Sequence, residues 1–334
     1  MEFNNILNDL KNKIYKPIYL FYGDEGYFID ELTNFISTNV LDESEKAFNQ
    51  TILYGKDVNV YSVIEQARRF PMMANLQVII IKEAQQIDKF KNFETYLQNP
   101  VKSTLLVFSF KNTHKFDKRT KVYIQLTKNG VVYESKRKYE REVYSWITSK
   151  LANENLTIHP EALRLLYESI GADLSRLSSE IKKLKITVPD DRAQINKDDV
   201  AQNIGVNRDF NVFELQKALS TKDKLKVYKI VDYFAKDKKN NPLIATVARL
   251  FDYFKKVLIY HSLADKSQYN AASALGVNKF FVDEYKLASN NYSLGKVISI
   301  ISYLRETDAK LKGVGAVSPD DGDLAKELFY KILH

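Results

Sequence analysis

The sequence has 334 residues, of which 45% are hydrophobic and 28% are charged, as is typical of an ordered globular protein with two or three domains. It contains no cysteine, which excludes disulfides, thiolate metal sites and cysteine nucleophiles and fits a reducing compartment. The net charge of +8 is compatible with a polyanionic partner such as nucleic acid. There is no signal-peptide pattern and no apolar stretch of membrane-spanning length, so we expect a cytoplasmic protein. The histidines lack metal-ligand spacing, so no metal site is expected.

The first motif is a strand, a glycine turn and a helix near the N-terminus. An apolar run at 18–22 predicts a strand, and apolar spacing over 27–38 predicts the helix that follows. In nucleotide-binding α/β domains this turn holds phosphates, with the pattern G-x-x-x-x-G-K-[ST]. Here Gly23, Asp24, Glu25 and Gly26 supply two carboxylates in place of a lysine and a hydroxyl. We interpret the turn as a degenerate nucleotide site that does not bind nucleotide.

Residues 1–140 alternate between strand and helix patterns. Further strands are predicted at 51–54, 78–81, 105–110 and 131–133, with a helix over 60–67. This alternation predicts a parallel sheet with crossover helices. Continuous apolar strands also indicate that both sheet faces are covered.

After residue 140 the strand patterns stop. We expect a small helical bundle over 141–208, with Pro160 at the start of one helix. From 209 to 334 the pattern is again helical, with a long apolar stripe over 242–258 and segments at 270–288, 293–312 and 322–333. The predicted fold class is therefore α/β plus all-α.

The strand at 78–81 ends in a second altered motif. In AAA+ ATPases the corresponding strand ends in Asp-Glu, where the aspartate helps to hold magnesium and the glutamate polarises water. Lys82 occupies the aspartate position, followed by Glu83, and an ammonium group cannot bind a cation. The turn at 23–26 thus lacks the groups that bind phosphate, and the end of the strand at 78–81 lacks the aspartate that binds magnesium. These are two independent differences from an active ATPase site.

The chain resembles the delta subunit of the bacterial DNA polymerase III clamp loader over nearly its full length. The segments that carry the resemblance are 19–25, 67–81, 116–121, 173–174, 180–184, 211–215 and 308–312. It implies an AAA+-like domain without ATPase activity (1–140), a three-helix lid domain (141–208) and a helical collar domain for oligomerisation (209–334). The Gly-Lys-Thr loop and Ser-Arg-Cys triplet of the ATP-hydrolysing subunits are absent.

The resemblance also implies a function and partners. The chain would bind the sliding clamp (the beta subunit) and open its ring for loading onto primed DNA, beside subunits of the gamma/tau and delta-prime type. It would be a non-catalytic component of the DNA polymerase III holoenzyme and would need no cofactor. The resemblance places the clamp-binding element at Phe70, Pro71, Met72 and Met73, where the family usually has a leucine–phenylalanine pair in place of the two methionines.

Two other hypotheses about the function remain open. One is an ATPase with an atypical loop, which Asp24 and Glu25 disfavour because they would repel phosphates. The other is a stand-alone DNA-binding protein, with phosphate contacts from basic residues beside the aromatic residues Tyr123, Tyr133 and Tyr139. The basic residues concerned are Lys115, Lys118, Arg119, Lys121, Lys136, Arg137 and Lys138. A charged helix face and a solvated connection would explain the same residues without DNA.

Overall fold

The computed structural model describes residues 2–112, 116–189, 192–205, 207, 209–314 and 320–334. The chain divides into two compact units, Met1–Lys138 and Tyr139–His334. This division lies two residues before the domain boundary predicted at 140. None of the helices formed by the described residues is long and apolar enough to cross a membrane.

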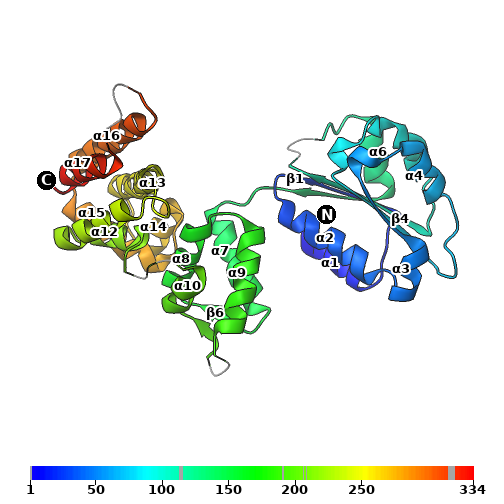
Figure 1. Cartoon of the computed structure of the whole chain (residues 1–334), viewed down its shortest axis with the longest axis horizontal. Helices are drawn as coiled ribbons and strands as arrows, with labels where there is room; N and C mark the ends of the chain where they lie inside the picture. The colour runs from blue at the N-terminus through cyan, green and yellow to red at the C-terminus, as the bar shows by residue number, and fades with distance from the viewer. Residues whose placement is uncertain (1, 113–115, 190–191, 206, 208, 315–319) are drawn as a thin grey trace. The chain divides into compact units, whose positions relative to one another are not determined.

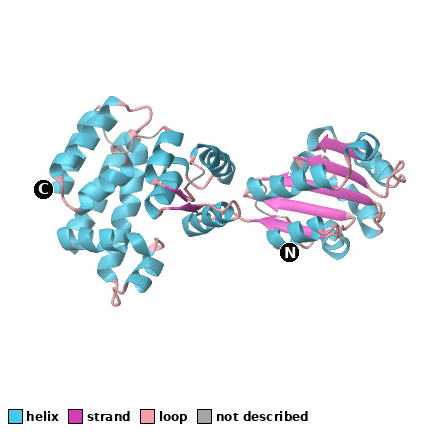
Figure 2. Ribbon diagram, turned by 90° about the horizontal axis from the view of Figure 1, so that it is seen from below, coloured by secondary structure: helices cyan, strands magenta, loops and turns pink. Residues whose placement is uncertain are grey.

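A parallel sheet forms the centre of the first unit (Figure 2). Within the described residues it has five strands in the spatial order β2–β3–β4–β1–β5. The strands are β1 (Ile18–Gly23), β2 (Gln50–Tyr54), β3 (Gln77–Lys82), β4 (Thr104–Lys111) and β5 (Val131–Ser135). Each lies where the apolar runs predict a strand. In β1, β3 and β4 nearly every residue is buried, as expected for strands covered on both faces.

Helices cover both faces of this sheet. Figure 1 shows α1 and α2 on one side and α4 and α6 on the other. Alternate strand residues such as Leu20, Ile79 and Phe108 share a core with Val63 of α4 and Leu126 of α6. The helices are α1 (Phe3–Lys11), α2 (Gly26–Asn39), α3 (Glu43–Asn49), α4 (Val60–Ala67), α5 (Glu94–Gln98) and α6 (Lys121–Asn129), with 3-10 turns η1 (Gly55–Asp57), η2 (Ala84–Gln86) and η3 (Phe90–Phe93).

The strand order places the turn after β1 where ligands bind in open α/β sheets. The chain leaves β1 for one edge of the sheet, returns through β3 to β4, and then crosses to β5 on the other side of β1. Ligands in such sheets bind at the carboxyl ends of the strands, at the point where the order reverses. That point lies beside Gly23, which is level with Lys111 of β4 and Ser135 of β5.

The first part of the second unit, residues 139–208, is called the lid segment below. Its elements are α7 (Glu140–Ala152), β6 (Thr157–Ile158), α8 (Pro160–Ile170), α9 (Leu174–Thr187), β7 (Gln194–Ile195) and α10 (Lys197–Ile204). The described residues thus form four helices where the resemblance implied three. The expectation that strands end at 140 is wrong, because β6 and β7 form a short parallel pair. Two-residue strands have no periodicity that a sequence pattern could reveal.

The described part of residues 209–334, called the collar segment below, is mainly helical, as predicted. The elements are α11 (Val212–Ser220), α12 (Lys224–Lys236), α13 (Leu243–Ser262), α14 (Gln268–Leu275), η4 (Lys279–Phe281), α15 (Val282–Asn291), α16 (Leu294–Leu311) and α17 (Asp321–Leu333). The segment predicted at 270–288 is instead divided into α14, η4 and α15. The reason is Gly276, whose φ of 68° ends α14 in the left-handed region. Buried apolar residues from all these helices share one core.

Candidate functional site

The turn between β1 and α2 is closed by bonds to β5. The N–H groups of Asp24 and Glu25 both donate to the Ser135 carbonyl, at 2.9 and 3.2 Å, and the Ser135 hydroxyl donates to the Glu25 carbonyl at 2.7 Å. Gly23 has a φ of 139°, and a Cβ there would lie 2.0 Å from the Ser135 carbonyl oxygen. Glycine at 23 is therefore needed for the close approach of β5, rather than for the approach of a phosphate.

The N-terminus of α2 is occupied by a carboxylate of the chain itself. Glu25 caps the helix, because its Oε1 accepts a hydrogen bond from the Tyr27 N–H at 3.0 Å. A helix N-terminus attracts anions through its unpaired N–H groups and its dipole. Here Glu25 takes that place, and Lys111, the nearby cation at the end of β4, pairs with Asp30 at 2.7 Å. The arrangement supports the interpretation of Gly23–Gly26 as a site without nucleotide.

The end of β3 has no arrangement suited to magnesium. Lys82 is the last residue of the strand and is half-buried. Glu83 follows with a φ of 52°, and its carboxylate accepts a hydrogen bond from Gln85. Among the described residues no group of three or more His, Cys, Asp or Glu side chains could hold a metal ion.

The loop between α4 and β3 presents apolar side chains to solvent. Phe70 is 87% exposed, Met72 is 61% exposed and Met73 is fully exposed, while Pro71 is half-buried. Met73 has a φ of 53°, in the left-handed region. Large exposed apolar groups that are contiguous along a loop are typical of interaction sites. Phe70, Met72 and Met73 are too exposed to cover the core of the sheet.

The base of this loop is fixed by buried polar side chains. Asn49, at the end of α3, accepts a hydrogen bond from the Met72 N–H at 2.7 Å and donates to the Met72 carbonyl at 2.9 Å. Gln77 donates to the Arg69 carbonyl at 2.7 Å, and Thr104 donates to the Ala67 carbonyl at 2.8 Å. The loop therefore combines an apolar tip with a backbone that is held on both sides.

The sequence interpretation missed these three polar residues. Gln77 and Thr104 each stand at the first position of an otherwise apolar strand, which is a signal that could have drawn attention to them. Asn49 gives no comparable signal, because its partner lies 23 residues away in the sequence.

Comparison with protein families gives one match in each of the two units. The family model of the DNA polymerase III delta subunit matches residues 19–136, and the model of the C-terminal domain of that subunit matches residues 209–329. The chain belongs to the DNA polymerase III delta subunit family. This membership places it in DNA replication, as a clamp-loader subunit of DNA polymerase III.

Individual relatives agree with the delta family assignment. The DNA polymerase III subunit delta of Bacillus subtilis (strain 168) is 26% identical over 337 residues, which cover 97% of this chain and 95% of that protein. The solved structure of the Bacillus subtilis DNA clamp loader delta protein matches with a TM-score of 0.55, at 24% identity and over 99% of each chain. The structural match confirms the predicted combination of an α/β part with helical parts.

Among the described residues predicted to contact DNA in this delta-family chain, all but the half-buried Lys138 are exposed, and two of them have acidic neighbours. Lys118 pairs with Glu134 at 3.1 Å, and Arg119 pairs with Asp117 at 3.2 Å. Burial would raise the pKa of Glu134, but the hydrogen bond from Lys118 holds that pKa below its usual value. Lys121 opens α6 and is exposed, as are Lys136 and Arg137, whereas Lys115 lies outside the described residues.

The tyrosines near these basic residues do not form a common stacking surface. Tyr133 is only 9% exposed, and burial raises its pKa. Tyr123 packs against Phe116 with their ring centroids 5.7 Å apart. Tyr139 is exposed, while Lys138 lies over the ring of Phe28 at 5.4 Å. Phosphate contacts stay a prediction, but the arrangement gives little support to a groove that stacks single-stranded bases.

Proposed function

We propose that this chain binds the ring-shaped sliding clamp, the beta subunit of DNA polymerase III, through Phe70, Pro71, Met72 and Met73. Binding would open one interface of the ring so that the clamp can be placed on primed DNA. The observation that carries the proposal is the exposed apolar tip on a fixed loop base. Family membership supplies the context of a clamp-loader subunit.

The geometry of the loop suits a wedge that inserts into an apolar pocket. Phe70 and Met72 offer large apolar groups, and the flexible thioether side chains of methionine adapt to irregular pockets. Methionine loses more rotamer freedom on binding than phenylalanine does. The bonds from Asn49 to Met72 offset part of this cost, because a backbone that is already ordered loses less entropy on binding.

The chain would act without catalysis and without a nucleotide cofactor. The turn at Gly23–Gly26 is closed by Ser135 and carries two carboxylates, which supports this part of the proposal. We infer that the collar segment joins the chain to clamp-loader subunits of the gamma/tau and delta-prime type. Within that assembly the chain would contact the phosphates of DNA and would not recognise its bases.

The test of clamp binding is the double variant Met72→Ala/Met73→Ser, measured by calorimetry against the clamp of the same organism. Truncating a hot-spot residue costs about 2 kcal/mol or more, so we expect affinity to fall by roughly thirtyfold or more. The thermal unfolding midpoint should stay nearly unchanged, because both side chains are exposed.

Ile186→Ser provides a matched control, because Ile186 is also a large exposed apolar residue but lies on α9. It should bind the clamp as the parent chain does. If the double variant unfolds at a much lower temperature and the protein that stays folded binds normally, the two methionines support the core and the proposed contact is wrong.

A further inference from the structure

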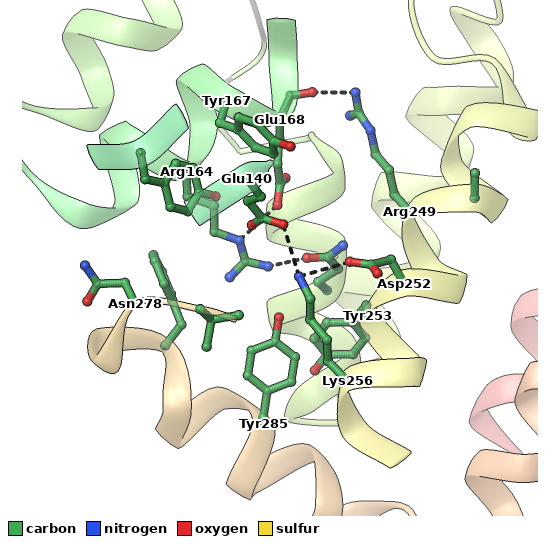
Figure 3. A pocket seen from close by; sticks show the side chains of 15 residues that line it. Glu140, Arg164, Tyr167, Glu168, Arg249, Asp252, Tyr253, Lys256, Asn278 and Tyr285 are labelled. Carbon is green, nitrogen blue, oxygen red and sulfur yellow. Dashed lines mark hydrogen bonds and ion pairs between the residues drawn. The ribbon is translucent and has the colours of Figure 1, made fainter. Parts of the chain in front are cut away.

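A buried arginine joins the lid segment to the collar segment. Arg164 of α8 donates through Nε to Glu168 of the same helix at 2.9 Å (Figure 3). Its Nη1 donates to Glu284 of α15 at 3.0 Å, and its Nη2 donates to Gln216 of α11. Two of the three acceptors therefore come from the collar segment, although Arg164 itself belongs to the lid segment.

Two aromatic rings of the collar segment also lie close to the same guanidinium. Its central carbon lies 4.4 Å from the centroid of the Phe213 ring and 4.8 Å from that of the Phe281 ring. Arginine is well suited to such a position, because its planar group can stack and donate several hydrogen bonds at the same time. Lysine could not reproduce both sets of contacts.

The charge on Arg164 is kept in spite of burial. Burial would lower the pKa of its guanidinium, but Glu168 and Glu284 raise that pKa well above its usual value. Burial raises the pKa of Glu284. A buried charge that loses its partners is strongly destabilising. Separation of the two segments would break the contacts of Arg164 with its collar partners together and leave only Glu168, so the cluster opposes movement between the segments.

Other ion pairs cross the same junction. Figure 3 shows Lys256 of α13 beside Glu140 of α7, and Arg249 of α13 bonded to the backbone carbonyl of Glu168. Three ion pairs join the lid segment to the collar segment: Lys256–Glu140 at 3.4 Å, Lys197–Glu214 at 2.5 Å and Lys217–Glu161 at 3.5 Å. They connect three helices of the lid segment, α7, α8 and α10, to the collar helices α11 and α13. Ion pairs thus connect the lid and collar segments at several separate points.

A cavity of about 400 Å³ lies within this junction. Three cations line it, Arg164, Lys256 and Arg249. Each of them is bonded to an oxygen of the chain itself. The groups around the cavity therefore connect helices to one another, which favours a structural role over a site for a charged ligand.

We propose that residues 139–334 move as one rigid block, with Arg164 as its central tie. The lid segment then follows the collar segment and not the α/β unit. If neighbouring subunits displaced the collar segment, the lid segment would move with it as far as residue 139. The two segments would not change their positions relative to each other. This inference concerns the helical unit alone and does not depend on the proposed clamp contact.

Distance measurements between two spin labels test the proposal in the full-length chain. The absence of native cysteines means that Ser175→Cys on α9 and Ser273→Cys on α14 would be the only labelled positions. We expect one narrow distance distribution in the otherwise unchanged chain. Arg164→Met and Arg164→Lys should both broaden it, since neither side chain can make the forked and stacked contacts. Arg305→Met, an exposed position on α16, is the matched control and should leave the distribution narrow.

The outcomes are distinguishable. A broad distribution, or one with two maxima, in the otherwise unchanged chain would overturn the rigid block. A distribution that stays narrow in the Arg164 variants, at unchanged helix content, would overturn the role of Arg164. If Arg164→Met does not fold, Arg164→Lys carries the same test, because it retains the charge and most of the volume.

Discussion

At the scale of single residues, Ser135 and Glu25 fill the turn that holds phosphates in related folds. The Ser135 carbonyl accepts hydrogen bonds from the N–H groups of Asp24 and Glu25, and the Glu25 carboxylate caps α2. A phosphate entering this turn would have to displace those acceptors while facing two carboxylates. The missing lysine could be read from the sequence, but the contribution of Ser135 could not, because it lies 110 residues after Glu25.

This closed turn leads to a prediction about nucleotide binding. Titration of the isolated chain with ATP and magnesium in a calorimeter should give no heat of binding, because the N–H donors are already bonded and the local charge is negative. A titration with ATP in the absence of magnesium serves as the control for weak ionic association. Micromolar affinity in the presence of magnesium would contradict the prediction.

At the scale of the elements, local signals located the strands of the main sheet and several of the helices correctly. Pro160 stands at the first position of α8, as expected from the sequence, and Asn196 caps α10. These signals succeed because the stabilising groups lie within one turn of the helix end. Contacts between distant elements were not predictable: Arg164 lies in an ordinary helical pattern, and only the structure places it beside Phe213 and Phe281.

Glu214 ties three helices, and its charge should make their packing dependent on pH. Burial would raise the pKa of Glu214, but hydrogen bonds from Lys197 and Lys226 outweigh burial and hold that pKa below its ordinary value of 4.5. A carboxyl group whose pKa is lowered by folding stabilises the folded state above the ordinary pKa, and this contribution is lost as the pH falls through the lowered pKa.

The corresponding experiment compares the parent chain with Glu214→Gln in urea unfolding at several pH values. We expect the variant to be less stable by about 3 kcal/mol at pH 7, a typical cost of breaking a buried ion pair. The difference should shrink as the pH is lowered below 4.5. Glu306→Gln, which removes an exposed surface carboxylate on α16, is the control and should change stability by less than about 1 kcal/mol. A difference that stays constant with pH would show that the charge of Glu214 is unimportant.

At the scale of the whole molecule, the change from alternating strands and helices to helices alone marks the division between the two units. The sequence predicts this division near 140 because burial on both faces of a parallel sheet and on one face of a helix leave different patterns. The structure divides at 138. The sequence does not show whether the helical part behaves as one body or two, because both arrangements require the same amphipathic helices.

The last prediction follows from this division and from the proposed clamp contact. A fragment of residues 1–138 contains the whole parallel sheet, the helices on both of its faces, and the loop at Phe70–Met73. Because the core of this unit is complete, we expect the fragment to fold alone and to bind the clamp within about threefold of the full-length affinity, a difference below about 1 kcal/mol.

The fragment of residues 139–334 is the matched control. It should fold and co-purify with other clamp-loader subunits but fail to bind the clamp, whereas the 1–138 fragment should show the reverse. Circular dichroism and thermal unfolding of both fragments establish folding before binding is measured. If a folded 1–138 fragment did not bind the clamp, the contact surface would have to include residues beyond 138, and the loop at 70–73 would not be sufficient for binding.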